Sequence, residues 1–175
     1  MLKHIITISL LMSATLAFGQ GWERVYGGGG LDQLNAVAQT PDGGFIMTGF
    51  YSLGQVYLIK SDADGNQQWS KNFPAGTFAE GKAVVATRDS GYAVAGNIEG
   101  LGAGGRDIYL FKTDAYGNVL WSKTFGGGQN DEAKGIVELP DGSLVVVGFT
   151  TNHLIQVTGE WTEDAGDAVW YLYTM

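Results

Sequence analysis

The sequence contains no cysteine and only two histidines, His4 and His153. The chain can therefore form no disulfide framework and can carry no lipid on an N-terminal cysteine. Cysteine nucleophiles and metal sites built from several histidines are excluded as well. A Ser-His-Asp triad would have to use His153, and the sequence has no Gly-x-Ser-x-Gly nucleophile elbow. Without disulfides, the fold has to be stabilised by the burial of a core.

Basic residues are also scarce. The chain has 10 Lys and Arg against 18 Asp and Glu, a formal net charge of −8, and no basic residue follows Lys134. A nucleic-acid-binding surface needs a basic patch or stripe, so nucleic acid is not expected as a partner. We interpret the acidity as a source of solubility rather than as a means of calcium capture.

The first 19 residues have the pattern of a secretory signal peptide. Lys3 gives a positive start, residues 5–18 are mostly apolar, and the small residues Ala17 and Gly19 fit cleavage after Gly19. The apolar run is shorter than the roughly 20 residues of a membrane-spanning helix, so an uncleaved anchor is the less favoured alternative. We expect a secreted protein, extracellular or at the cell surface, that begins at Gln20 and has no membrane span.

A block of 28 residues occurs three times without a gap, at 22–49, 69–96 and 121–148. Each copy begins with Trp, has a basic residue two positions later and an aromatic at its fifth position, contains an Asp-Gly or Ser-Gly turn, and ends in Gly. The tryptophans are Trp22, Trp69 and Trp121, and the closing glycines are Gly49, Gly96 and Gly148. Such a period indicates supersecondary units that stack to bury a common core. We expect one repeat domain at 20–175, in units 22–68, 69–120 and 121–175.

Each unit is expected to contain four short strands. In the middle unit these are 69–73, 83–87, 92–96 and 108–112, and the last strand of the third unit is assigned to 169–173. The third strands are largely apolar, which is typical of strands buried on both faces. Asp-Gly turns favour hairpins between the strands. Four antiparallel strands in units of 47 to 52 residues are typical of propeller blades, so the predicted class is all-β.

One stretch carries a resemblance to a known family. Residues 107–127 read Asp-x-Tyr-Leu-x-Lys-x-Asp-x-x-Gly-Asn-x-x-Trp-Ser-Lys-x-Phe-Gly-Gly, followed by an Asp-Gly turn and an apolar strand that ends in Gly. This pattern resembles the secreted bacterial and archaeal β-propeller repeats of the SBBP type, over nearly all of the mature chain. The resemblance implies an extracellular or cell-surface repeat protein, usually longer, whose ligand is generally undefined. The chain departs from the family in its three units and in having no surface-sorting module after them.

Three blades are fewer than the four to eight of a closed propeller. We therefore expect an incomplete or open propeller of three four-stranded antiparallel blades, with apolar blade faces at both ends of the arc. Two explanations stay open: the chain is a truncated or degenerate part of a longer array, or copies pair to complete a ring. The long connection between the third and fourth strands of the last unit favours the first, because symmetric closure requires a well-formed final unit.

The sharpest chemical candidate is a turn in which Asp62, Asp64 and Asn66 place side-chain oxygens at alternate positions. Oxygens of this kind can bind a hard cation such as Ca²⁺. The favoured alternative is that Asp62 caps the turn through its own backbone. The loop has no closing Glu, and the equivalent turn has Tyr116 in place of the second Asp. No other cofactor is expected.

Two further propeller families share this hairpin. It resembles the Asp-box of sialidase-type propellers, although the spacing to Trp69 is longer and the Ser and Asp are displaced. It also resembles the tryptophan-docking turn of quinoprotein propellers, although the Thr before Gly is missing. One hairpin geometry, with Trp69 and Trp121 packed between blades, accounts for both resemblances, and neither implies an activity.

The glycine runs at 27–30 and 126–128 are interpreted as connections at a blade edge. A phosphate-binding loop would need Gly-Lys-Ser/Thr and a following helix, and neither is present. Asp32 and Asp131 follow the two runs at equivalent positions. Their expected role is to cap the ends of these loops, and a ring of carboxylates around a central channel is the alternative.

The connection between the third and fourth strands is the favoured place for a partner to bind. It lengthens from unit to unit while the framework stays constant, and loops on a rigid scaffold commonly carry recognition. Its candidate ligand-binding side chains are Tyr51, Arg106, His153 and Trp161, and Tyr and Trp are typical interface anchors. The alternative is tolerated variation in surface loops.

These observations predict a non-enzymatic binding or scaffold module that recognises a protein or a glycan. One alternative is a propeller hydrolase or lyase acting on extracellular polysaccharide, which would need a pair of carboxylates in a concave site. A structural component of the cell envelope is a further alternative. The sequence selects no catalytic residue.

Overall fold

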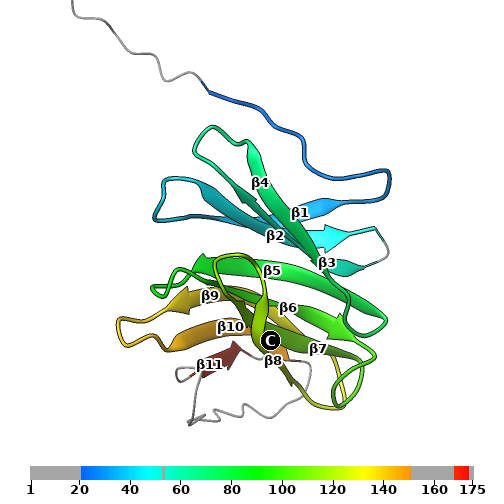
Figure 1. The fold of residues 1–175 in the computed structure, drawn as a ribbon. Helices are drawn as coiled ribbons and strands as arrows, with labels where there is room; N and C mark the ends of the chain where they lie inside the picture. The colour runs from blue at the N-terminus through cyan, green and yellow to red at the C-terminus, as the bar shows by residue number, and fades with distance from the viewer. Residues whose placement is uncertain (1–20, 53, 151–167, 174–175) are drawn as a thin grey trace, which may run out of the picture.

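The computed structural model describes residues 21–52, 54–150 and 168–173, and these contain eleven strands and no helix (Figure 1). The all-β class is confirmed. No helix that could cross a membrane is found in these ranges. The strands are β1 Gln33–Gln39, β2 Phe45–Tyr51, β3 Gln55–Ser61, β4 Gln67–Phe73, β5 Phe78–Ala86, β6 Tyr92–Glu99, β7 Arg106–Thr113, β8 Val119–Phe125, β9 Asp131–Glu138, β10 Leu144–Thr150 and β11 Ala168–Tyr173.

The strands form three sheets, of which the first two each consist of four consecutive antiparallel strands, β1-β2-β3-β4 and β5-β6-β7-β8. In the third sheet β9 and β10 are antiparallel, but β11 lies parallel to β10. The expectation of three four-stranded antiparallel blades is therefore wrong for the third sheet. A parallel neighbour needs a connection of a dozen or more residues, and the segment 151–167 between β10 and β11 has that length.

The sheets are out of phase with the tryptophan-headed units. Trp69 lies in β4, which pairs with β3 of the same sheet, and Trp121 lies in β8, which pairs with β7. Each of these strands is joined to its partner by a tight Asp-x-x-Gly-Asn turn, and such a turn forces the two strands it connects to pair. The first two sheets therefore span residues 33–73 and 78–125, and Trp22 precedes the first strand.

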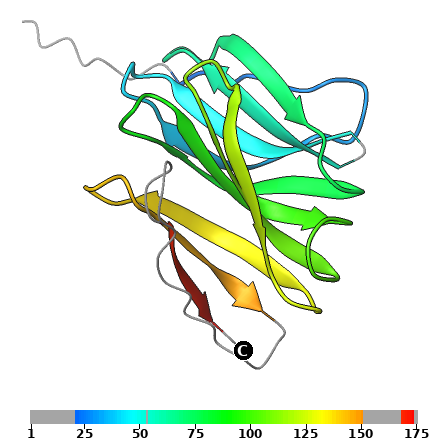
Figure 2. The same cartoon turned by 60° about the horizontal axis from the view of Figure 1, so that its bottom comes forward.

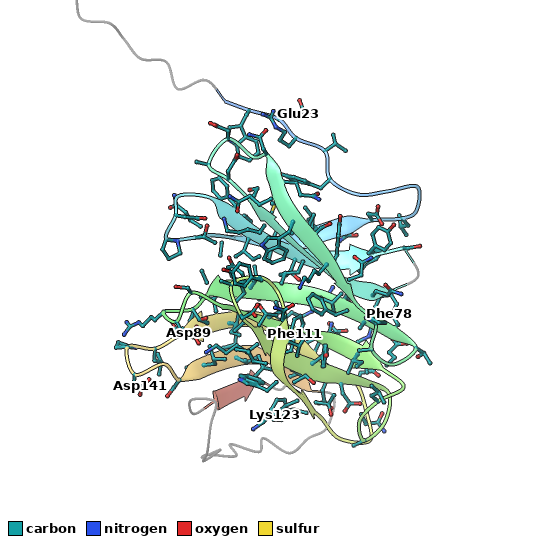
Figure 3. All side chains as sticks on the ribbon, viewed as in Figure 1. Glu23, Phe78, Asp89, Phe111, Lys123 and Asp141 are labelled. Carbon is teal, nitrogen blue, oxygen red and sulfur yellow. The ribbon has the colours of Figure 1, made fainter. Side chains whose placement is uncertain are left out.

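The second sheet is buried on both faces, with the first and third sheets stacked on opposite sides of it (Figures 1 and 2). Successive residues of β6 alternate between the two cores, so that Tyr92 and Val94 face the first sheet while Ala93 and Ala95 face the third. This arrangement explains why the strand has no polar face. Side chains fill the space between the sheets (Figure 3).

The repeated glycines lie opposite a β-bulge in the first strand of each sheet. The bulge adds one residue to the first strand of the sheet, and the neighbouring strand carries glycine beside it. A Cβ on that glycine would collide with a backbone carbonyl of the bulged strand, so no other residue fits. The extra residues are Asn35, Lys82 and Lys134, the glycines are Gly49, Gly96 and Gly148, and the carbonyls belong to Gln33, Glu80 and Glu132.

A tryptophan at the edge of the first sheet connects it to the second sheet. The Trp69 ring lies 5.8 Å from the ring of Tyr92, and a Cβ on Gly117 in the β7–β8 turn would lie 3.0 Å from Trp69 Cη2. Lys71, two residues later, donates from Nζ to Asn118 Oδ1 over 2.7 Å. The Trp, the basic residue and the Gly-Asn turn therefore belong to one contact between sheets.

The same contact occurs on the outer face of the first sheet, where the segment before β1 takes the place of a strand. The Trp22 ring lies 5.8 Å from Phe45 and packs against Gly65, and its Nε1 donates to Ala63 O over 3.1 Å. Arg24 Nη2 donates to Asn66 Oδ1 over 3.4 Å. The spacing of the repeat therefore encodes the contact between successive layers.

Replacing Trp69 with Ala removes the indole that packs into the core between the first two sheets. We expect the free energy of unfolding in urea to fall by roughly 3 kcal/mol, the lower end of the cost of truncating a buried Trp. Trp22→Ala is the matched control, because Trp22 is 43% exposed and should cost less than half as much. Equal losses would contradict the described role of Trp69.

Candidate functional site

The stacked sheets have two ends with different chemistry. One end, here called the turn end, carries the tight turns between β1 and β2, β3 and β4, β5 and β6, and β7 and β8. The opposite end, called the loop end, carries the glycine-rich connections. Asp89 and Asp141 lie at the turn end and Phe78 lies at the loop end (Figure 3).

Arg106, at the loop end, is bound within the structure. Its Nη2 lies 2.8 Å from Glu99 Oε1 and its Nη1 lies 3.2 Å from Glu132 Oε1. The guanidinium also lies 5.9 Å above the ring of Phe78. The hydrogen bond to Glu99 raises the pKa of Arg106 above its usual value. Arg106 therefore connects the second sheet to β9.

Tyr51 lies in a different sheet from Arg106. Its ring packs 5.3 Å from the ring of Tyr57, and it lines a polar cavity of about 250 Å³ together with Gln67 and Lys71. His153 and Trp161, the other two residues of the predicted binding loop, lie outside the described residues. The structure thus describes half of that candidate surface.

The carboxylate of Asp62 is engaged by its own turn. Oδ1 accepts hydrogen bonds from the backbone N–H groups of Asp64 and Asn66 at 3.0 and 2.8 Å, and Oδ2 accepts one from Asn66 Nδ2 at 3.0 Å. These hydrogen bonds lower the pKa of Asp62. Asp114 repeats the arrangement with Tyr116 and Asn118. This geometry supports the turn-capping role over calcium binding by Asp62, Asp64 and Asn66.

Asp32 and Asp131 cap the glycine loops. Asp32 accepts hydrogen bonds from the N–H groups of Gly28 at 2.6 Å and Ser52 at 3.1 Å. Asp131 accepts one from Gly127 N–H at 2.7 Å. The expected role of loop-end capping is confirmed for both residues.

A cavity of about 330 Å³ opens at the turn end between the first and second sheets. Aromatic side chains supply much of its apolar surface, and Tyr116, which is 74% exposed, stands at its edge. Hydroxyl, amide and charged groups supply the polar surface. The lining residues include Asp42, Lys60, Gln68, Trp69, Ser90, Tyr92 and Tyr116. Small-molecule sites have this combination of aromatic walls and a few placed polar groups.

Lys60 is the buried charge of the cavity. Its side chain is 4% exposed, and Nζ lies 2.8 Å from Asp42 Oδ2. It also donates to Ser61 O at 2.8 Å and to Gln68 Oε1 at 3.1 Å. The hydrogen bond from Lys60, assisted by Thr40, lowers the pKa of Asp42 to about 2. The repeat contained a signal for this pair that was missed. Lys112 and Asp89 stand at the equivalent positions of the next unit and form the same ion pair.

Ser90 adopts an unusual backbone conformation in this cavity. Its φ is 69°, whereas the equivalent positions in the first and third sheets are glycines, Gly43 with φ 82° and Gly142 with φ 92°. A left-handed conformation at a residue other than Gly costs of order 1 kcal/mol. Residues held in such conformations cluster at functional sites, so the Ser90 hydroxyl is a candidate ligand contact.

The described residues that line this cavity can bind a ligand, but they do not provide a pair of carboxyl groups for acid–base catalysis. Asp42 is the one acidic side chain among the described lining residues, and it is already paired with Lys60. No group of three His, Cys, Asp or Glu that could hold a metal occurs in the described ranges. No protein-family model matches the chain, and a search of curated proteins found no match.

Asp42→Asn removes the carboxylate that pairs with Lys60. At pH 7 we expect a loss of about 1 kcal/mol in the free energy of unfolding, a value kept small because the Asp42 carboxylate is 55% exposed and solvent screens its charge. The pKa of Asp42 lies below its ordinary value of 3.8, so the stabilisation is complete above pH 4 and is lost toward pH 2. Urea denaturation of the wild type and Asp42→Asn should show a smaller difference in the free energy of unfolding at pH 2 than at pH 7.

Asp64→Asn is the control, since the carboxylate of Asp64 forms no ion pair with the described residues. A difference between wild type and Asp42→Asn that is the same at both pH values would contradict the pairing with Lys60.

Proposed function

We propose that this chain is a secreted β-propeller repeat module that binds glycan in the cavity between its first two sheets and catalyses no reaction. The single observation that carries the proposal is the cavity, whose aromatic walls lie next to fixed polar groups. A sugar has an apolar C–H face and several hydroxyl groups. Aromatic rings can pack on the C–H face, and amide, hydroxyl and carboxylate groups can form hydrogen bonds with the sugar hydroxyls.

The propeller assignment is supported by the way the layers repeat. Two consecutive four-stranded antiparallel sheets pack face to face, each with its first strand bulged at the same place. The tryptophan contact recurs on the outer face of the first sheet. Face-to-face packing of such sheets is the arrangement of propeller blades. The N-terminal signal pattern supports secretion, and the SBBP-type repeat pattern supports an extracellular role.

The position of the cavity differs from the loop site expected from the sequence. Tyr51 and Arg106 lie at the loop end and are engaged with Tyr57 and Glu99. The cavity instead uses the turn end, where hairpins hold Ser90 and Tyr116 in place. Rigid elements position a binding group more accurately than long loops, which favours the turn end.

A polysaccharide hydrolase is the less favoured function. Glycoside cleavage needs two carboxyl groups on either side of the bond. The described lining of the cavity offers one, Asp42. No feature of the described residues favours a purely structural envelope role, and assembly into a completed ring stays a prediction.

The test is a glycan microarray followed by calorimetry with the best oligosaccharide. We expect Tyr116→Ala to weaken binding roughly tenfold, since truncating an aromatic anchor costs more than 1 kcal/mol. Ser90→Gly should also weaken binding while leaving the fold at least as stable, because glycine prefers the conformation of Ser90.

Tyr51→Ala is the control at the loop end. Loss of binding in Tyr51→Ala with full binding in Tyr116→Ala would place the site at the loop end and contradict the cavity. An array without any bound glycan would contradict glycan recognition.

A further inference from the structure

Asp107 is a buried carboxylate that forms no ion pair with the described residues, although the N–H groups of Ala103 and Gly104 lie near it. The residue has 0% exposure, and neither Oδ1 nor Oδ2 has a hydrogen-bond partner of normal geometry. Burying an ionised carboxylate is costly unless a cation or several hydrogen bonds compensate it. Arg106, the adjacent residue, directs its charge to Glu99 and Glu132 instead. The fold therefore leaves Asp107 needing a positive charge or a proton.

Asp131 brings a second carboxylate to the same place. Asp131 is 2% exposed and begins β9, the strand of the third sheet that packs on β5, β6 and β7. A Cβ built on Gly126 would collide with Asp107 Oδ1 and would lie 2.6 Å from Asp131 Oδ2. Two carboxylate oxygens from different sheets thus converge on one point beside Gly126, where Asp131 Oδ2 also accepts the hydrogen bond from Gly127 N–H that caps the loop. Like charges this close repel each other strongly unless a cation lies between them.

Two glycine-rich loops lie against the two carboxylates and bring both oxygen atoms and N–H groups to this region. A Cβ on Gly102, whose φ is 117°, would collide with Asp107 Oδ2. The loop that follows packs directly on the other loop, since a Cβ on Gly104 would lie 2.8 Å from Gly128 O. Asn130 Oδ1 lies there too and accepts a hydrogen bond from Arg106 N–H at 3.0 Å. The surroundings supply oxygen donors from side chain and main chain, and the sequence has no cysteine to supply sulfur.

We propose that Asp107 and Asp131 hold a hard divalent cation, calcium, at the loop end between the second and third sheets. Calcium binds six to eight oxygens, including carboxylates, amide oxygens and backbone carbonyls, in flexible geometry. The two aspartates supply the charge, and main-chain oxygens of the two loops and water complete the shell. Such a cation would stabilise the junction of the two sheets.

The electrostatics of Asp107 agree with this assignment. Burial raises its pKa, the nearby N–H groups of Ala103 and Gly104 oppose that rise, and the negative charge of Asp131 adds to it. Without a cation, the ionised form of Asp107 is therefore disfavoured. A bound cation would reverse the effect, because an opposite charge favours the ionised form.

The chain contains its own comparison at the junction of the first and second sheets. By the alignment of the repeat, Gln55 stands in place of Asp107 and Ala79 in place of Asp131. Both residues are uncharged. The pair of carboxylates therefore occurs at the junction of the second and third sheets and not at the junction of the first and second sheets. The Asp62 turn provides a second comparison, because three hydrogen bonds within the turn engage both oxygens of its carboxylate.

The experiment is thermal unfolding and calorimetric titration of the full chain after dialysis against a chelator. Millimolar calcium should raise the melting midpoint by about 5 °C or more if the site is well saturated. Asp107→Asn and Asp131→Asn should each weaken calcium binding at least tenfold and remove most of the rise. Asp62→Asn should keep the full response.

Asp107→Asn removes a buried negative charge that lies beside Asp131. The variant should therefore be at least as stable as the wild type without calcium, and we expect it to fold. No response of the wild type to calcium would overturn the proposal. Loss of the response in Asp62→Asn alone would also overturn it, as would a response to magnesium without one to calcium. These outcomes are independent of glycan binding at the turn end.

Discussion

The packing of a tryptophan on the glycine turn of the next sheet is the contact on which the arrangement of this molecule depends. A four-stranded sheet with two apolar faces cannot bury both of them alone. Trp69 extends from the edge of the first sheet to Gly117 of the second, and Lys71 adds a hydrogen bond to Asn118. The contact sets how far apart the sheets lie and how they are aligned. It also requires glycine at the turn, because a side chain there would meet the indole.

The two ends of the stack follow from this constraint. At the turn end, tight hairpins hold Lys60, Asp42 and Ser90 around a cavity between two sheets. At the loop end, glycine connections pass so close to one another that carboxylates are buried beneath them. The proposed glycan site and the proposed calcium site therefore belong to opposite ends. The proposed glycan site uses side chains between the first and second sheets, and the proposed calcium site would stabilise the junction of the second and third sheets.

Much of the layering could be predicted from the sequence, because the repeat carries it. The apolar third strands indicated burial on both faces, and the second sheet has that burial. The closing glycines marked a position where no Cβ fits, and the bulge explains why. The residue at which each sheet begins could not be predicted from the repeat, since the period is the same wherever the boundary between two units is drawn. Only the tight turn before Trp69 decides which strands pair.

The candidate sites were harder to predict for physical reasons. Lys60 and Asp42 come together through strand pairing across a hairpin, which a one-dimensional pattern does not display. Asp107 stands just before the strand predicted at 108–112, and its burial depends on a glycine loop and on β9 of another sheet. The parallel pairing of β11 depends on a long connection and has no local signature.

The most direct test of the central contact is an NMR measurement of the distance between the Trp69 indole and Gly117. We expect nuclear Overhauser effects between the indole ring protons and the Gly117 Hα protons, together with a ring-current shift of those Hα resonances that disappears in Trp69→Ala. If the folded wild-type protein lacks these effects, the packing of Trp69 on Gly117 is ruled out as the contact between the two sheets.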